Sequence, residues 1–304
     1  MRQPMRRNDL KDTTAKKLAL PALFATAIIW GSSFFIMKDT VDNFPVFYLL
    51  ALRFLAASIL IGAFGYKRLK SIDKGTIFGG FVMGLTLFIA YIFQTFGLVG
   101  TTPGKNAFLT AAYCVMVPFF EWLIFKNRPD RYNIIAAVSC LIGIGFVSLD
   151  GDLSLDLGDG LSLICGVFFA LNIISIAHFT QKHDILMLTA LQFGFAGLMS
   201  LVSALFFETW PASVPPRTWA AIAYLAVMVT AVAFSLQNFG IKYEDASRAS
   251  IVLALESVFG VLFSALFYGE TLSPGVLFGF VIIFFSVVTS ETKLSFLTGG
   301  DTSP

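Results

Sequence analysis

Ten long runs of apolar residues follow one another along this 304-residue chain, with short polar segments between them. About 20 helical residues cross a membrane core ~30 Å thick, and the runs reach or approach that length. Helices satisfy every backbone polar group within the segment, whereas barrel strands would alternate in polarity. The sequence therefore predicts an all-α, polytopic integral membrane protein. The ten expected transmembrane helices lie near Leu18–Met37, Phe44–Tyr66, Gly75–Val99, Asn106–Phe125, Tyr132–Leu149, Leu157–Ala177, Ile185–Phe207, Trp219–Ile241, Ser250–Tyr268 and Val276–Ser290.

The second half of the chain repeats the first. Phe93–Pro129 aligns without a gap on Leu236–Leu272, an offset of 143 residues, and Ala51–Phe54 recurs as Ala190–Phe193. Each copy contains five runs, and copies with an odd number of spans are inserted in opposite directions. Inverted repeats of this kind are typical of transporters. The identical pairs in the longer alignment are Gln94 and Gln237, Phe96 and Phe239, Gly97 and Gly240, Ala111 and Ala254, Val115 and Val258, Phe120 and Phe263, and Leu123 and Leu266.

Lysine and arginine mark one side of the predicted bundle. With the N-terminus in the cytoplasm, 17 of the 21 basic residues fall in cytoplasmic segments and 3 outside, which is the bias expected of an inner-membrane protein. Lys105 and Arg248 share a repeat position yet fall on opposite sides, as inversion requires. We expect a multi-pass protein of the cell inner membrane with both termini cytoplasmic. The expected organisation is a basic tail over 1–17, a first repeat over 18–149, an acidic linker over 150–156, a second repeat over 157–290 and a tail over 291–304.

Two ionisable residues lie well inside predicted spans. Glu256 is about two turns into the ninth, where a carboxylate costs several kcal/mol unless it faces a cavity or a partner. It is a candidate site for a substrate ammonium group or a proton, with a structural hydrogen-bonded carboxylate as the equal alternative. Arg53 is a candidate for a substrate carboxylate, for Glu256, or for helix carbonyls. We favour a structural role for Arg53, because ideal helix rise places the two residues at different depths.

Further polar residues within the spans are candidates to line a substrate cavity. Each has a plain alternative, which is a hydrogen bond between helices or a place in an interfacial aromatic belt. Tyr113 holds the repeat position of Glu256, so the halves differ chemically where a central site would lie. Pro118 is expected to kink the fourth span. The cavity candidates besides Glu256 are Trp30, Ser33, Tyr91, Gln94, Tyr113, Asn172 and Gln237.

An enzyme is the main rival class, and the motifs for it are missing. The two histidines, His178 and His183, fall together at a loop, and no H-E-x-x-H, G-x-S-x-G or nucleotide-binding glycine loop occurs. The three cysteines lie inside apolar runs without metal-binding spacing, so we interpret them as small buried hydrophobes. Only 13% of the residues are charged, and the short loops hold no soluble domain. We therefore expect no enzyme, cofactor or metal site, and no nucleic-acid partner.

The motifs of this chain resemble those of the EamA-type transporters in the drug/metabolite transporter superfamily. The resemblance implies ten helices in two inverted repeats around a cavity that opens alternately to each side, and transport, commonly export, of amino acids or related metabolites. The chain departs from the family at Ser257, where a proline is common, and at Lys126-Asn127, where Gly-Glu is common. The residues that carry the likeness are Trp30–Phe34, Arg53–Ala57, Asn106–Tyr113, Val117-Pro118, Leu255-Glu256 and Gly269–Leu272.

The function to expect is that of a secondary transporter, which moves a small metabolite outward through the lipid bilayer by alternating access. Protons are a candidate coupling ion through Glu256, and either a monomer or a homodimer fits the sequence. A passive facilitator or channel of the same fold is the alternative. A non-transporting receptor or scaffold is a third possibility, which the short loops disfavour.

Overall fold

The structure is a computed structural model that describes residues 7–101, 103–148, 156–268 and 273–292, and every regular element in them is a helix. Most of the expected acidic linker, the segment Gly269–Leu272 and Lys293 lie outside the described residues. The first half forms α1 (Arg7–Gly31), α2 (Ser33–Val41), α3 (Val46–Phe64), η1 (Tyr66–Ser71), α4 (Lys74–Gly100), α5 (Pro103–Ala111), α6 (Tyr113–Phe125) and α7 (Arg131–Ser148). The second half forms α8 (Leu157–Phe179), α9 (Ile185–Phe207), α10 (Pro216–Tyr224), η2 (Leu225–Val232), α11 (Ala233–Tyr243), α12 (Ala246–Leu253), α13 (Glu256–Tyr268) and α14 (Pro274–Thr292).

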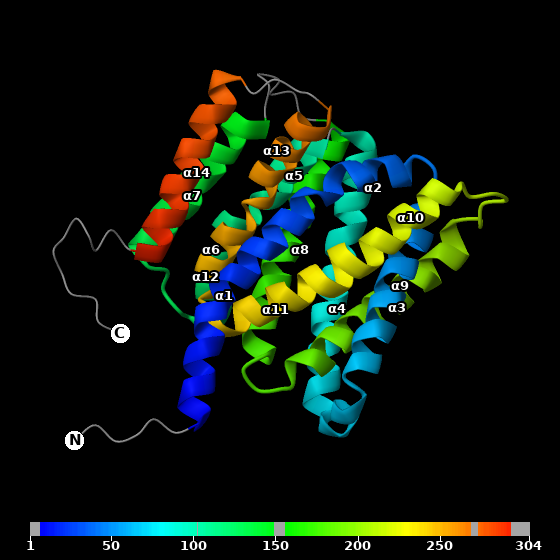
Figure 1. Ribbon diagram of the computed structural model, residues 1–304, viewed down its shortest axis with the longest axis horizontal. Coiled ribbons are helices and arrows are strands. Elements are labelled where there is room, and N and C mark those ends of the chain that lie inside the picture. Colours follow the sequence, from blue (N-terminus) through cyan, green and yellow to red (C-terminus); the bar gives the residue numbers. More distant parts are fainter. Residues whose placement is uncertain (1–6, 102, 149–155, 269–272, 293–304) are drawn as a thin grey trace.

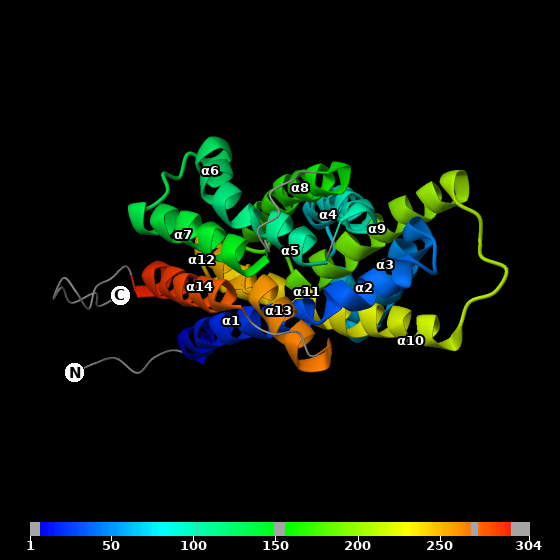
Figure 2. The same ribbon diagram turned by 90° about the horizontal axis from the view of Figure 1, so that it is seen from above.

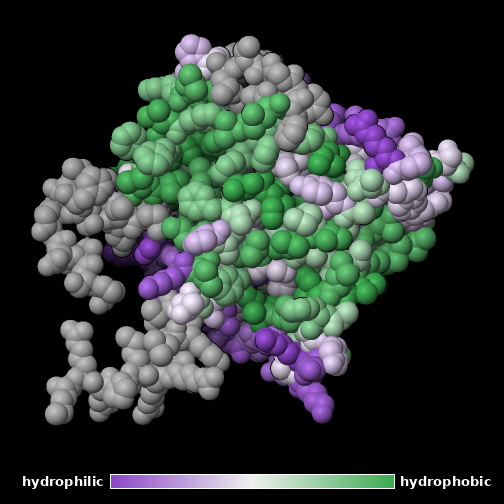
Figure 3. Space-filling view, in the orientation of Figure 1, coloured by the Kyte–Doolittle hydropathy of each residue, from purple (hydrophilic) through white to green (hydrophobic). Residues whose placement is uncertain are grey.

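The helices are built to lie in a membrane. Apolar side chains cover the flank of the bundle, and hydrophilic ones gather at the end near the start of α1 and at the opposite end beside α2 and α10 (Figure 3). The exact count of ten spans remains a prediction. In the described residues, two apolar helices are shorter, Arg131–Phe146 and Pro274–Ser290, and seven segments are long and apolar enough to cross a membrane: Thr14–Val41, Val46–Phe64, Lys74–Gly100, Asn106–Phe125, Leu157–Phe179, Ile185–Phe207 and Pro216–Tyr243.

The helix contacts of one half recur between the repeat partners in the other half, and the paired helices lie side by side in both views (Figures 1 and 2). α3 packs along its repeat partner α9, and α7 packs along its repeat partner α14. α4 of the first half packs along α8 of the second half. Their repeat partners, α11 of the second half and α1 of the first half, pack along each other in the same way. The repeat in the sequence is therefore a repeat of helix contacts as well.

The ends of α3 and α9 show that the two copies are inverted. Glu208, which follows α9, accepts hydrogen bonds from the N–H groups of Phe47 and Tyr48 at the start of α3 (3.0 and 3.1 Å). At the other end Arg68, which follows α3, forms an ion pair of 2.9 Å with Asp184, the residue that precedes α9. Each helix thus begins where its partner ends. We call the end of the bundle near the start of α1 the N-terminal end, and the opposite end the far end.

A pair of similar hydrogen bonds marks the two ends. At the far end, Lys38 Nζ donates to the carbonyl oxygen of Val99, at 3.2 Å. At the N-terminal end, Gln181 Nε2 donates to the carbonyl oxygen of Lys242, at 2.7 Å. Both bonds join the end of the first span of a repeat to the end of its third span. The two ends of the bundle are therefore closed by similar contacts.

The fourth and ninth spans are broken at the same repeat position. α5 gives way to α6 at Ala112, and α12 gives way to α13 at Ala254 and Leu255. At both breaks, hydrogen bonds between residues three apart replace regular helical ones. The ninth span breaks although Ser257 stands where a proline was expected, so proline is not required. In the fourth span, Pro118 lies inside α6, after the break rather than at it.

The departure at Lys126 has a structural consequence. This residue ends α6 with φ of 62°, in the left-handed region, and it is the only described residue other than glycine with positive φ. Glycine adopts this conformation without steric strain, whereas a residue with a Cβ atom adopts it with strain. The chain therefore holds a strained helix end where the resemblance places a glycine.

Candidate functional site

A cavity lies between the halves, at the level of the two helix breaks and toward the far end. The empty space in it amounts to about 490 Å³, its open side included. Seven of the nine residues that the sequence marked as candidates are among those that line it. The lining residues are Trp30, Ser33, Phe34, Met37, Arg53, Tyr91, Gln94, Thr95, Leu98, Asn106, Thr110, Tyr113, Phe169 and Glu256.

Arg53 is a buried cation at the cavity wall. Its side chain is fully buried, Nε donates to Thr230 Oγ1 at 2.9 Å, and the guanidinium lies 4.7 Å from the centre of the Tyr91 ring. No carboxylate of the described residues, Glu256 included, comes within 4.0 Å of it. Contact with an aromatic ring offsets part of the desolvation cost of the charge, but does not neutralise it. The positive charge is therefore available to a ligand in the cavity.

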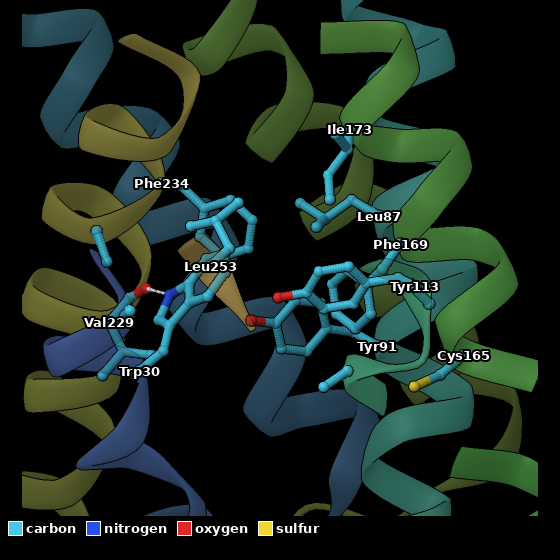
Figure 4. Close-up of a cluster of buried hydrophobic side chains, with 14 of the residues drawn as sticks. Trp30, Leu87, Tyr91, Tyr113, Cys165, Phe169, Ile173, Val229, Phe234 and Leu253 are labelled. Atoms are coloured by element: carbon cyan, nitrogen blue, oxygen red, sulfur yellow. Dashed lines mark hydrogen bonds between the residues drawn. The ribbon is translucent and has the colours of Figure 1, made fainter. Parts of the chain in front are cut away.

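The π-helical segment η2 holds two of the lining residues in place. Thr230 accepts the hydrogen bond from Arg53 and donates its own proton to the carbonyl of Leu225, five residues earlier (2.8 Å). The carbonyl of Val229 accepts the indole N–H of Trp30 at 3.1 Å (Figure 4). A π-helix leaves such carbonyl groups accessible to side chains and occurs often at functional sites. The repeat partner of this segment, within α4, is ordinary α-helix.

Tyr113 and Glu256 meet across the pseudo-two-fold axis. They share one repeat position, and Tyr113 donates its hydroxyl proton to Glu256 Oε1 at 3.2 Å. Each is the first residue of the helix after a break, α6 for Tyr113 and α13 for Glu256. Unpaired N–H groups at helix N-termini favour negative charge, and broken helices of transporters use them to bind anionic groups. Figure 4 shows the hydroxyl groups of Tyr91 and Tyr113 pointing toward Trp30 on the opposite side.

Two further polar atoms of the lining have no partner in the described structure. Thr95 Oγ1 and Asn106 Oδ1 are buried without a hydrogen bond. The amide nitrogen of Asn106 is engaged, since it donates to the carbonyl of Gln94 and to Ser162 Oγ (3.1 and 2.7 Å). A buried acceptor without a donor is costly unless water or a ligand supplies one. The cavity therefore offers hydrogen-bonding positions besides its charged groups.

Two of the candidates lie outside the cavity. Asn172 donates to the carbonyl of Met83 and to Thr86 Oγ1 (2.8 and 3.0 Å), and so joins α8 to α4. Gln237 is buried in α11, with its Oε1 atom unpaired. In the structure Asn172 therefore forms hydrogen bonds between helices, which was the alternative to a place in the cavity.

The sequence did not single out several residues that line the cavity. Asn106 and Thr110 stand four residues apart and precede Tyr113 on one helical stripe, which is a signal that could have found them. Met37 and Phe169 resemble any other apolar residue of their spans, so their positions depend on the packing. Thr95 is equally inconspicuous between Gln94 and an apolar stretch.

Comparison with known proteins gives the family. The model of the EamA-like transporter family matches residues 17–149 and again residues 156–291. The chain belongs to the EamA-like transporter family. As a member of this family it is a multi-pass membrane transporter that contacts the lipid bilayer and a small-molecule substrate.

Relatives of this EamA-family chain carry transporter names without substrates. An uncharacterized transporter of Archaeoglobus fulgidus is 32% identical over 272 residues, which cover 90% of this chain and 85% of that protein. The uncharacterized inner membrane transporter YedA of Escherichia coli K12 is 25% identical over 275 residues, 88% of each chain. A solved crystal structure matches with a TM-score of 0.76 at 16% identity, over 93% of this chain and 99% of the other. That likeness concerns the fold alone.

Proposed function

We propose that this protein is a secondary transporter for small metabolites that carry both an anionic and an ammonium group, of which amino acids are the simplest. The observation that carries the proposal is Arg53, a fully buried guanidinium at a cavity wall with no carboxylate within ion-pair distance among the described residues. An anionic substrate group would supply the missing countercharge. Glu256, which lines the same cavity and accepts the hydrogen bond from Tyr113, would receive the ammonium group.

The apolar part of such a substrate would lie against the aromatic wall. Trp30, Phe169 and the two tyrosine rings line the cavity beside the charged groups. An inverted fold with helices broken at its centre supports alternating access, since the two halves can exchange conformations. Transport outward and a cytoplasmic position for both termini are parts of the same proposal.

Transport into liposomes tests the proposed substrate class. Purified protein is reconstituted, and uptake is measured for amino acids, for the corresponding amines and for the corresponding carboxylic acids. We expect the amino acids to be transported at least tenfold faster than either analogue, because each analogue leaves one buried charge unpaired. Equal rates for all three, or no flux for any, would contradict the proposal. Flux that stops at equal concentrations despite a pH gradient would favour a facilitator instead.

Glu256 is the proposed proton carrier. In Glu256→Gln, we expect accumulation driven by a pH gradient to be lost, while exchange of labelled for unlabelled substrate continues at a lower rate, because the substrate ammonium group loses its countercharge. The reason is that an amide keeps the hydrogen bond from Tyr113 but cannot take up and release a proton. If the variant still accumulates substrate in response to the gradient, Glu256 does not couple transport to protons.

A further inference from the structure

A second polar cluster is buried in the second half of the chain. It lies toward the N-terminal end of the bundle, away from the cavity. Its hydrogen-bonded members are Thr189 and Gln192 in α9 and Asn238 in α11, and we include Gln237, which precedes Asn238 in the chain and is buried as well. Asn238 Nδ2 donates to Thr189 Oγ1 at 2.9 Å and to Gln192 Oε1 at 3.1 Å. Gln192, Gln237 and Asn238 are at most 2% exposed.

This cluster has more polar atoms than partners. Gln192 Nε2, Gln237 Oε1 and Asn238 Oδ1 are all buried without a hydrogen bond. Turning the amides of Gln192 and Asn238 over exchanges their donors and acceptors but leaves as many atoms unpaired, because Thr189 already donates to the carbonyl of Ile185. Purely structural polar networks are normally satisfied. The cluster therefore has hydrogen-bonding groups to offer to a ligand.

The repeat relates this cluster to the cavity. Gln192 holds the position of Arg53, Gln237 that of Gln94, and Asn238 that of Thr95. Arg53, Gln94 and Thr95 all line the cavity. The distance of these three residues from the far end of the bundle matches the distance of their counterparts from the N-terminal end, because α3 and α9 are antiparallel. Exchange of conformation between the halves would expose the cluster in place of the cavity.

We propose that Gln192, Gln237 and Asn238 form a second, uncharged subsite for the transported solute, which opens toward the N-terminal end when the far-end cavity closes. This inference rests on the proposed transport function. Its ligand is a hydrogen-bonding group of the solute, such as a carboxylate, an ammonium or a hydroxyl. Because an amide stands where the cavity has a guanidinium, this subsite holds an anionic group more weakly. The solute therefore has a lower affinity at the N-terminal end than at the far end.

Cysteine labelling tests the opening of the subsite without requiring transport. Gln237→Cys and Asn238→Cys are treated in detergent with N-ethylmaleimide, and the labelled peptide is quantified by mass spectrometry. Ala196→Cys is the matched control, since Ala196 is fully buried in α9 against α4 and outside the cluster. We expect both cluster cysteines to react at least tenfold faster than the control. Labelling no faster than that of Ala196→Cys would overturn the subsite, whether or not the protein transports.

A transport measurement then tests the affinity difference. In proteoliposomes of fixed orientation, Gln192→Leu is expected to raise the KM at least fivefold for substrate added on the N-terminal side, and to leave the KM on the far side unchanged. A structural role would lower the yield of folded protein and affect both sides equally. Equal changes on the two sides, or none, would overturn the assignment of Gln192.

Discussion

Arg53 and Gln192 hold the same place in the two halves of the molecule, but their surroundings differ. Arg53 lies at an open cavity, bound to Thr230 of η2 and packed on Tyr91. Gln192 lies in a closed cluster with Asn238. The contacts between the helix pairs around them remain equivalent. Inverted symmetry in this fold therefore constrains the packing of the backbone, while the polar side chains are free to differ.

Removal of the positive charge of Arg53 should have the largest effect on transport, because it makes this position of the first half chemically like the same position of the second. For Arg53→Gln, we expect transport to fall roughly 100-fold, as loss of a buried charged contact costs 2–5 kcal/mol. Arg68→Gln is the control, since Arg68 pairs with Asp184 on an exposed surface, and it should change uptake less than twofold. Initial rates in liposomes measure both. Retention of more than a third of the activity in Arg53→Gln would mean that the charge does not bind the solute.

Two equivalent glycines test the symmetry of the backbone. A Cβ atom on Gly97 would lie 2.6 Å from Ser162 Oγ and 2.9 Å from the carbonyl oxygen of Gly158, whereas one on Gly240 would lie 2.5 Å from the side chain of Leu23 and no closer than 3.2 Å to a backbone atom there. We expect Gly97→Ala to destabilise the protein by about 2 kcal/mol and Gly240→Ala by about 1 kcal/mol. Denaturation in detergent measures both.

Gly62→Ala is the control for the glycine pair, since no atom lies within 4 Å of the added methyl group. It should be neutral or slightly stabilising, because alanine is favoured over glycine in a helix interior. Equal losses for Gly97→Ala and Gly62→Ala would refute the close approach of α4 and α8.

The π-helix distinguishes the eighth span from its partner, the third. Thr230→Val keeps the shape of the side chain but removes the acceptor for Arg53 Nε. We expect about tenfold weaker substrate binding, or roughly 1.4 kcal/mol, because the bond involves a charged donor. Thr230→Ser restores a hydroxyl and should recover most of the affinity. If valine and serine behave alike, the contact with Thr230 does not position Arg53.

The smallest effect is expected at Lys126, where the fourth span ends in the left-handed conformation. Lys126→Gly should stabilise the protein by about 0.5–1 kcal/mol, because glycine adopts this conformation without steric cost. Lys126→Ala removes the same charge but keeps the Cβ atom, and it should give no such gain. A higher unfolding temperature for both variants would point to the charge rather than to the backbone.

The sequence predicted the helical membrane fold and the repeat because both depend on patterns within the chain. Apolar runs determine helices, and the 143-residue offset alone relates Tyr113 to Glu256. The same patterns marked Arg53 and Glu256, since charge is rare inside a membrane span. Residues whose role depends on which side of the helix faces the cavity were harder to assign. Asn172 looked like Gln94 in the sequence, but it packs against α4.

Two structural features had no signal in the sequence. The π-helix η2 is an apolar stretch like its neighbours, and its contacts with Trp30 and Arg53 are visible only in the folded structure. The break in the ninth span forms with Ser257 where a proline is common, so no proline in the sequence signals it. Both features depend on how the two halves pack together, which single segments do not reveal.

The hydrogen bond from Tyr113 to Glu256 has a consequence for how such a chain can arise. In a homodimer of half-length chains, a residue on the two-fold axis always faces its own copy, so tyrosine would face tyrosine and glutamate would face glutamate. A donor opposite a carboxylate at this position requires two different copies. Divergence of the two copies is therefore the step that makes this bond possible, and a homodimer of one half-length chain cannot reproduce the centre of the molecule.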